Sequence, residues 1–170
     1  MVDSKKISHK KDSFTVNLIP SSCNNNYNHI FNVFMKLQIK TKGQIEDYII
    51  KEVTKYYVRT LGVGPRESKC YILEDMIIIR FQGRLLPIEE NLIKMLDDSN
   101  KGIDLVKSIR KEVHSITTKQ LSPMIKKLTG HKVISSHSDI STITGERIEI
   151  FILDGNFENE LSLFSPSDRL

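Results

Sequence analysis

Two pairs of β-rich segments, each joined by a tight turn, constrain the fold of this chain more than any other feature. In the first pair, residues 68–73 and 76–84 are separated by only Glu74 and Asp75. A two-residue loop between antiparallel strands needs positive φ, which Asp tolerates better than most residues other than glycine. The segment therefore predicts a hairpin with Asp75 in its turn, and a single bent strand is the alternative.

The second pair comprises residues 132–142 and 146–153, which are joined by a turn ending at Gly145. Successive side chains of a strand point to opposite faces of a sheet. The later strand of each pair alternates in this way, which predicts one buried face. The alternating sets are Ile77, Ile79 and Phe81 against Met76, Ile78, Arg80 and Gln82, and Ile148, Ile150 and Ile152 against Arg147, Glu149 and Phe151.

A helix is predicted over residues 42–61, ahead of the first hairpin. Thr41 and Gln44 have the spacing of a capping box, in which the hydroxyl and the amide each accept a hydrogen bond from a backbone N–H at the start of a helix. Apolar residues then recur at helical spacing as far as Leu61. Gly64-Pro65 follows as a turn into the next strand.

The longest predicted helix, residues 102–129, is amphipathic and basic. Its apolar stripe advances in steps of three and four residues: Leu105/Val106, Ile109, Val113, Ile116, Gln120/Leu121, Met124 and Leu128. Most cations lie off that stripe: Lys107, Arg110, Lys111, Lys119, Lys126 and Lys127. Pro123 has no backbone N–H to donate, so a kink or a restart is predicted there, with Ser122 as the new N-cap. Gly130 ends the helix.

With a short helix over residues 88–96, these segments predict the order α-β-β-α-α-β-β. This is an α+β domain, residues 41–154, with one four-stranded, mainly antiparallel sheet covered on one side by long helices. Residues 1–40 are predicted to form a basic, largely disordered N-terminal extension, and residues 155–170 an acidic polar C-terminal tail. The edge strands of such a sheet can pair between copies, so a homodimer is a further expectation.

The net charge of +4 is unevenly distributed. Residues 101–132 hold eight Lys or Arg against two carboxylates, whereas residues 133–168 hold one Arg against seven carboxylates. The basic helix and the acidic part either face each other or each meet a charged partner. Binding of nucleic acid through the basic helix is the alternative function. The acidic part and the lack of aromatic residues beside the lysines weaken it.

No motif for catalysis, a metal ion or a cofactor is present. The two cysteines lie 47 positions apart, and the five histidines lack the spacing of metal ligands. Gly62-Val63-Gly64 follows a predicted helix rather than a strand, which favours a turn over a phosphate loop. We therefore expect no enzyme, no metal and no cofactor. An enzyme that uses Asp75, Asp139 or His137 is the least favoured hypothesis.

The chain is expected to be cytosolic. No apolar run approaches the ~18 residues needed to cross a bilayer. The basic residues at the N-terminus are not followed by the apolar segment of a secretory signal.

Several of these motifs resemble the MpsC-type family of small bacterial domains. The motifs are Gly64-Pro65, Asp75 before an apolar strand, Thr129-Gly130, Asp139-Ile140-Ser141 and Thr144-Gly145-Glu146-Arg147. The resemblance spans about residues 41–154. That family often has Arg at position 63, where this chain has Val, so the resemblance does not imply an anion site at this loop.

The resemblance implies a role beside membrane proteins. The family name refers to a Na+-translocating, membrane-potential-generating system. It implies a non-catalytic cytosolic accessory or regulatory subunit at the inner face of the membrane, in a system that moves sodium and has a link to bicarbonate transport. The docking candidates are the basic helix face (Lys107, Arg110, Lys111, Lys119, Lys126, Lys127) and the patch of Asp139, Ser141 and Arg147; Gly64, Pro65, Asp75, Gly130 and Gly145 are turn residues.

Asp139 itself has two interpretations. It contacts a partner or ligand, or it caps the end of the hairpin or pairs with Arg147, as Asp commonly does near turns.

Overall fold

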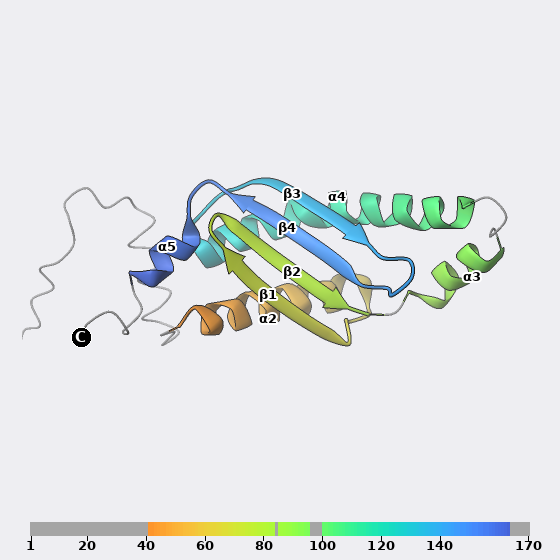
Figure 1. Ribbon diagram of the computed structural model, residues 1–170, viewed down its shortest axis with the longest axis horizontal. Coiled ribbons are helices and arrows are strands. Elements are labelled where there is room, and N and C mark those ends of the chain that lie inside the picture. Colours follow the sequence, from red (N-terminus) through yellow and green to blue (C-terminus); the bar gives the residue numbers. More distant parts are fainter. Residues whose placement is uncertain (1–40, 84, 96–99, 164–170) are drawn as a thin grey trace, which may run out of the picture.

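The computed structural model describes residues 41–83, 85–95 and 100–163 (Figure 1). The predicted α+β architecture is confirmed, and one further helix follows it. The predicted N-terminal extension, residues 1–40, lies outside the described residues. The elements are α2 (Lys42–Leu61), β1 (Glu67–Leu73), β2 (Met76–Gln82), α3 (Pro87–Met95), α4 (Lys101–Thr129), β3 (Val133–Ile140), β4 (Arg147–Leu153) and α5 (Phe157–Ser162).

The four strands form one sheet in the order β1-β2-β4-β3, and every neighbouring pair is antiparallel. Each predicted hairpin makes one half of the sheet, and β2 and β4 join the halves. In the first turn the positive φ, 52°, falls on Glu74 rather than on the predicted Asp75. The carboxylate of Glu158 on α5 accepts a hydrogen bond from the Glu74 N–H at 2.8 Å, which holds the turn in this conformation.

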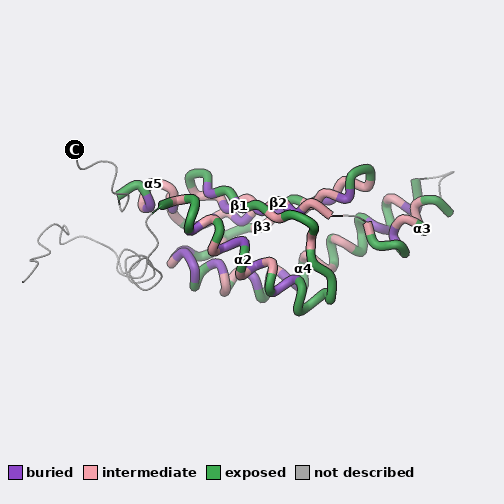
Figure 2. The backbone as a smooth tube through the Cα atoms, turned by 90° about the horizontal axis from the view of Figure 1, so that it is seen from below, coloured by how far each residue is buried: buried purple, intermediate pink, exposed green. Residues whose placement is uncertain are grey.

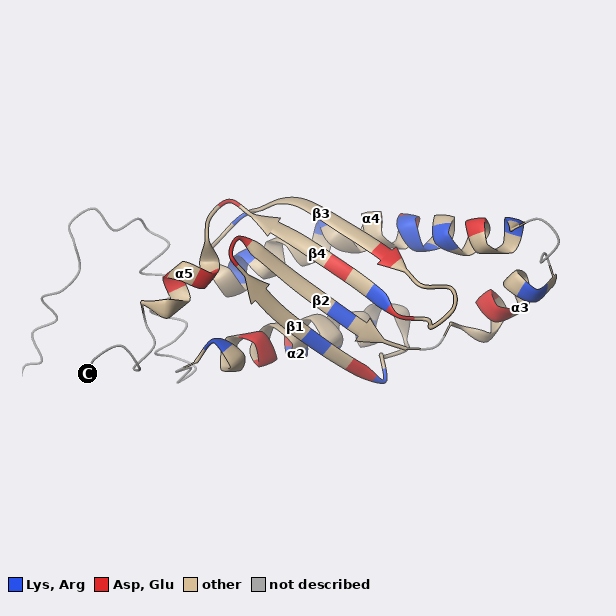
Figure 3. Ribbon diagram, viewed as in Figure 1, with Lys and Arg blue, Asp and Glu red and all other residues tan. Residues whose placement is uncertain are grey.

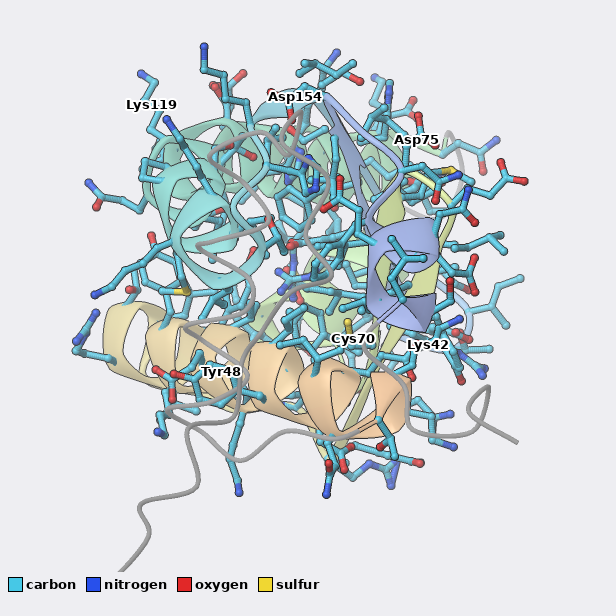
Figure 4. All side chains as sticks on the ribbon, turned by 90° about the vertical axis from the view of Figure 1, so that its left-hand side faces the viewer. Lys42, Tyr48, Cys70, Asp75, Lys119 and Asp154 are labelled. Atoms are coloured by element: carbon cyan, nitrogen blue, oxygen red, sulfur yellow. The ribbon has the colours of Figure 1, made fainter. Side chains whose placement is uncertain are left out.

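Both long helices lie on one face of the sheet, and the core fills the space between the two layers (Figure 2). The Thr41 capping box opens α2 as predicted, and Gly62, at φ 73°, ends it. Cys70 points into this core from β1 (Figure 4) and is a free thiol. The side chains that are 0% exposed include Ile45, Ile49, Val53, Ile77, Ile79, Leu121, Ile125 and Phe151.

α4 continues through Pro123 without interruption, so the predicted restart at Ser122 is wrong. Leu121 and Ile125, on either side of the proline, are both 0% exposed and hold the helix against the core. Pro123 lies on the exposed side, where water can bond the carbonyl of Lys119 that the proline leaves without an N–H donor.

The buried stripe of α4 is displaced from the predicted one. Ile109 is 43% exposed and Ile116 is 63% exposed, although both were assigned to the apolar stripe. The helix buries Val106, as predicted, but in its middle it buries Thr117, with Arg110 and His114 between these two residues on the side that faces the sheet. The middle of the inward-facing stripe is therefore polar.

β4 alternates as predicted, but the face that carries its charges is the buried one. Glu149 and Phe151 are 0% exposed and face the helices, whereas Ile148 is 41% exposed. On the outer face, Ile150 pairs with Ile78 of β2. This outer face is the one that the long helices leave open (Figure 2).

The predicted C-terminal tail differs from the structure because residues 157–162 form the helix α5. Phe157 is 1% exposed and Leu161 is 4% exposed, so the helix closes one end of the core. Asn156 caps α5 through a hydrogen bond from the Asn159 N–H at 2.9 Å. Residues 164–170 lie outside the described part of the chain.

Candidate functional site

A charged and hydrogen-bonded cluster lies inside the core, where apolar side chains would be expected. The Tyr57 hydroxyl, from α2, donates a hydrogen bond to Oε1 of Glu149 on β4 at 2.5 Å. Arg147, two residues earlier on the same face of β4, places its Nε 3.4 Å from that carboxylate oxygen. The Glu149 side chain is only 1% exposed, so its charge must be compensated by these neighbours rather than by water.

α4 completes this cluster from the other side. The Thr117 hydroxyl lies 3.4 Å from the Tyr57 hydroxyl, and Nδ1 of His114 lies 3.9 Å from the Glu149 carboxylate. These two residues occupy the polar part of the inward-facing stripe of α4. The helix thereby brings hydrogen-bonding groups to a position where the sheet carries a buried charge.

Burial of the Tyr57 hydroxyl and, after it, the negative charge of Glu149 raise the pKa of Tyr57. A phenolate beside a buried carboxylate is unfavourable because two like charges would share a site with little water. Tyr57 therefore stays protonated and acts as a hydrogen-bond donor to Glu149 rather than as a proton acceptor.

The guanidinium of Arg147 is held by aromatic rings. Its Cζ lies 4.3 Å from the centroid of the Tyr57 ring and 4.7 Å from that of Phe81. Among the described residues, neither Nε of Arg147 nor Oε2 of Glu149 has a hydrogen-bond partner. The arginine is thus fixed in position by its aromatic neighbours, while its buried Nε–H has no acceptor among the described residues.

A second arginine joins α3 to α4. Arg110 donates to Glu89 through Nε at 2.6 Å and through Nη2 at 2.7 Å. The Leu86 N–H also donates to this carboxylate, at 2.7 Å. Such a bidentate pair fixes the orientation of both side chains. It ties the start of α3 to the middle of α4 and places Arg110 near Arg147.

The pair of Glu89 and Arg110 predicts a pH dependence of stability. Burial alone would raise the pKa of Glu89, but the hydrogen bonds from Arg110 and from the Leu86 N–H outweigh it and lower that pKa. A pKa that is lower in the folded than in the unfolded state gives stability that is complete above the unfolded pKa. That stability is lost as the pH falls through the folded pKa.

We expect Glu89→Gln to lower the free energy of unfolding by about 1 kcal/mol at neutral pH, because Gln keeps a hydrogen-bond acceptor but loses the charge. The deficit should shrink as the pH falls through the carboxyl pKa, since the wild-type group is then protonated too. Urea unfolding at a series of pH values measures it, with Glu90→Gln as the matched control on the same helix. A deficit that does not change with pH would contradict the argument.

A groove between the first half of α4 and β3 gathers several of the residues that the sequence singled out. It has a volume of about 440 Å³, and its charged lining includes Lys107, Arg110, Lys111, Asp139 and Arg147. An adjoining hollow of about 410 Å³ is lined by Lys107, Asp139 and Ser141. Figure 3 shows the cations along this half of α4, beside the charged end of β4. We call the larger hollow the basic groove.

Three predicted residues do not join this groove. Lys119, Lys126 and Lys127 lie on the second half of α4, on its exposed side. Lys119 points away from the body of the protein (Figure 4). The basic face predicted as one surface therefore divides into two parts.

The structure also changes the role predicted for Asp139. Its side chain is 80% exposed and lies 4.0 Å from Nζ of Lys107, whereas Arg147 pairs with Glu149. The predicted pairing of Asp139 with Arg147 is therefore wrong, because the two side chains leave opposite faces of the sheet. Ser141 holds the turn instead, since its hydroxyl accepts a hydrogen bond from the Thr144 N–H at 3.2 Å.

The remaining predicted turn residues lie where the chain reverses. Gly130, at φ 83°, ends α4, and Gly145, at φ 71°, sits in the turn before β4. The carbonyl of Asp75 accepts a hydrogen bond from the Leu153 N–H at 2.8 Å. Gly64-Pro65 lies between α2 and β1 and lines a further pocket.

That pocket has a volume of about 480 Å³ and is formed by the end of α2, the start of α3 and the turn before β4. Both Arg110 and Arg147 line it, as they line the basic groove. We call it the arginine pocket. The two arginines therefore lie between the two hollows.

Sequence reasoning missed Tyr57, Glu89, His114 and Glu149. The signal for Glu149 was present, because Arg147 and Glu149 share the strand face of Phe151 and Leu153. The others come together only through tertiary packing between segments that are distant in sequence. Within residues 41–83, 85–95 and 100–163, no group of His, Cys, Asp or Glu is placed to hold a metal ion, and no helix is long and apolar enough to cross a membrane.

Comparisons with known proteins agree with the sequence motifs. The family described as "Na+-translocating membrane potential-generating system (MpsC)" matches residues 41–155. A protein of Bacillus subtilis (strain 168) described as "Uncharacterized protein YbcI" is 38% identical over 122 residues, which cover 72% of this chain and 95% of the relative. No solved structure matches the chain significantly.

Proposed function

The chain belongs to the MpsC family, and from this premise we propose that it is a non-catalytic accessory or regulatory subunit of a Na+-translocating, membrane-potential-generating system. It would work in the cytosol, at the inner face of the membrane, and dock to the membrane partners through the basic groove. The family description supports a link to such a system, and the accessory role and the docking are our inference.

The observation that carries the docking proposal is the convergence of cations in one exposed groove. Lys107 and Lys111 are exposed on successive turns of α4, and Arg110 lies below them, held by Glu89. Exposed charges arranged on one side attract a partner of opposite charge and fix its orientation. The groove would therefore receive an acidic segment of a membrane partner.

A membrane pull-down with charge-reversal variants tests this proposal. The tagged full-length chain is crosslinked to membranes, and recovered integral membrane proteins are identified by mass spectrometry. We expect the wild type to recover ion-translocating subunits, and the double variant Lys107→Glu with Lys111→Glu to recover severalfold less. Arg110 is left in place because its loss would disturb α3.

The matched control is Lys126→Glu with Lys127→Glu, which changes the net charge equally on the other half of α4. Equal losses in both variants would show a nonspecific charge effect and contradict docking through the groove. Recovery of no membrane protein by the wild type would contradict the proposal as a whole.

The alternative is a nucleic-acid-binding regulatory protein that uses the same cations. The observation in its favour is the basic half of α4, and the acidic side chains of Asp104, Glu112 and Asp139 beside it weigh against it. Affinity for RNA or DNA that falls steeply with salt, together with no recovery of membrane proteins, would favour this alternative.

A further inference from the structure

The arginine pocket contains a partly buried cation, Arg147, whose Nε–H has no acceptor among the described residues. The Arg147 side chain is 12% exposed, and its Nε is 3.4 Å from Glu149 without forming a hydrogen bond among the described residues. A guanidinium carries five N–H donors and stays charged at any physiological pH. Nε is the Arg147 donor that is buried without a partner among the described residues, and it lies against Glu149, so the Nη groups are the donors that a ligand in the pocket can reach.

The position of this guanidinium is fixed before any ligand arrives. Tyr57 and Phe81 hold it by cation–π contacts at 4.3 and 4.7 Å, and both aromatic rings also line the arginine pocket. Their own edge-to-face packing, with centroids 5.2 Å apart, restricts the rings in turn. A preorganised arginine loses little entropy on binding, which is the arrangement found where carboxylates and phosphates are recognised.

The rest of the pocket wall is apolar and partly open to solvent. Leu61, Val63 and Leu86 are 40, 57 and 38% exposed, and all three line the pocket. Arg66 is a third cation at the wall, after Arg110 and Arg147, and is exposed; Glu90 is the acidic residue there. Apolar side chains that converge on a few fixed polar groups are typical of sites for small molecules.

We propose that the arginine pocket binds a small molecule that carries a phosphate or a carboxylate on an apolar body. The oxyanion accepts hydrogen bonds from the Nη groups of Arg147, and the apolar body covers Leu61, Val63 and Leu86. The volume of about 480 Å³ is suited to a molecule of this size. This site shares Arg110 and Arg147 with the basic groove, but the exposed lysines of that groove, Lys107 and Lys111, do not line it.

An NMR titration of the 15N-labelled full-length protein tests the proposal. The four compounds, added at constant ionic strength, are phenyl phosphate, benzoate, inorganic phosphate and phenol. We expect phenyl phosphate or benzoate to shift the Arg147 Nε–Hε resonance saturably. Inorganic phosphate should bind more weakly because it lacks the apolar body, and phenol more weakly because it lacks the charge. The stronger of the two aromatic anions identifies the preferred oxyanion.

Two variants separate binding from folding. Arg147→Lys keeps the charge but loses the planar fork and is expected to weaken binding about tenfold. Arg147→Gln combined with Glu149→Gln removes both buried charges together, so a folded protein without the guanidinium is available even if the lysine variant unfolds. Lys119→Ala, which lies outside both hollows, is the control and should bind within about twofold of the wild type.

Three results would overturn the proposal. The first is no saturable shift with either aromatic anion. The second is unchanged affinity in a folded Arg147 variant, and the third is phenol binding as tightly as the anions. Each of these outcomes leaves docking through the basic groove unaffected, so the two proposals fail independently.

Discussion

Replacing Arg147 with methionine is expected to lower the free energy of unfolding by about 3–5 kcal/mol at neutral pH, because it leaves a buried carboxylate without its cation. Glu149 is 0% exposed, and its remaining contacts come from the Tyr57 hydroxyl and the neighbouring His114. A loss of this size is a large fraction of the 5–15 kcal/mol that stabilises a typical domain. Urea unfolding followed by circular dichroism, with midpoint and slope compared, measures it.

The double variant Arg147→Met with Glu149→Gln distinguishes the physical cause. If the unpaired charge is responsible, neutralising Glu149 should restore most of the stability. Replacing both members of a buried ion pair together often changes the free energy of unfolding very little. If the double variant is as unstable as the single one, the loss comes instead from the cation–π contacts with Tyr57 and Phe81. The unpaired charge of Glu149 would then not be the cause of the lost stability.

Gly102→Ala is expected to lower the free energy of unfolding by about 3 kcal/mol, the upper part of the range for overpacking. The reason is that rigid backbone, rather than a flexible side chain, occupies the space that the new Cβ would need. A Cβ at this position would lie 2.3 Å from the carbonyl oxygen of Leu92 and 2.8 Å from the Cα of Ile93. α3 would have to move away from α4. Since Leu86 and Glu90 line the arginine pocket, ligand binding there should weaken as well.

Gly43→Ala is the matched control for this substitution. No atom of the described residues lies within 4 Å of a Cβ built at Gly43, which lies in the first turn of α2. Alanine in a helix is favoured over glycine by about 0.5–1 kcal/mol, so this variant should be at least as stable as the wild type. Thermal unfolding of both variants measures the difference. A Gly102→Ala protein as stable as the Gly43→Ala protein would show that α3 adjusts freely.

The sequence was sufficient for every described helix and strand except α5, because the local signals of those elements were strong. The capping box at Thr41, the two-residue loop at Glu74 and Asp75 and the alternation in β4 each predicted an element that is present. α5 was missed because a helix of six residues offers only Phe157 and Leu161 as periodic apolar positions. A pattern of that length is too short to separate a helix from an irregular tail.

The candidate site was harder to predict because local periodicity counts apolar residues and ignores which polar ones are buried. In α4, Ile109 and Ile116 fit the spacing of a buried apolar stripe, but both side chains are exposed in the structure. The cations of the basic groove were found because they cluster in the sequence. The partners of Arg147 were not, since Tyr57 meets Glu149 only when α2 packs on the sheet. Neither spacing nor composition carries that information.

The strand order has a consequence for how the chain folds. Each hairpin joins neighbouring segments, but the central pairing brings Met76 of β2 against Ile152 of β4, across the whole of α3 and α4. Closing so long a loop costs entropy before its contacts compensate, and pairings of this kind slow folding. We therefore expect the transition state for folding to form when β2 meets β4, with both hairpins already in place. Substitutions along that pairing should then slow refolding, whereas those confined to α5 should mainly speed unfolding.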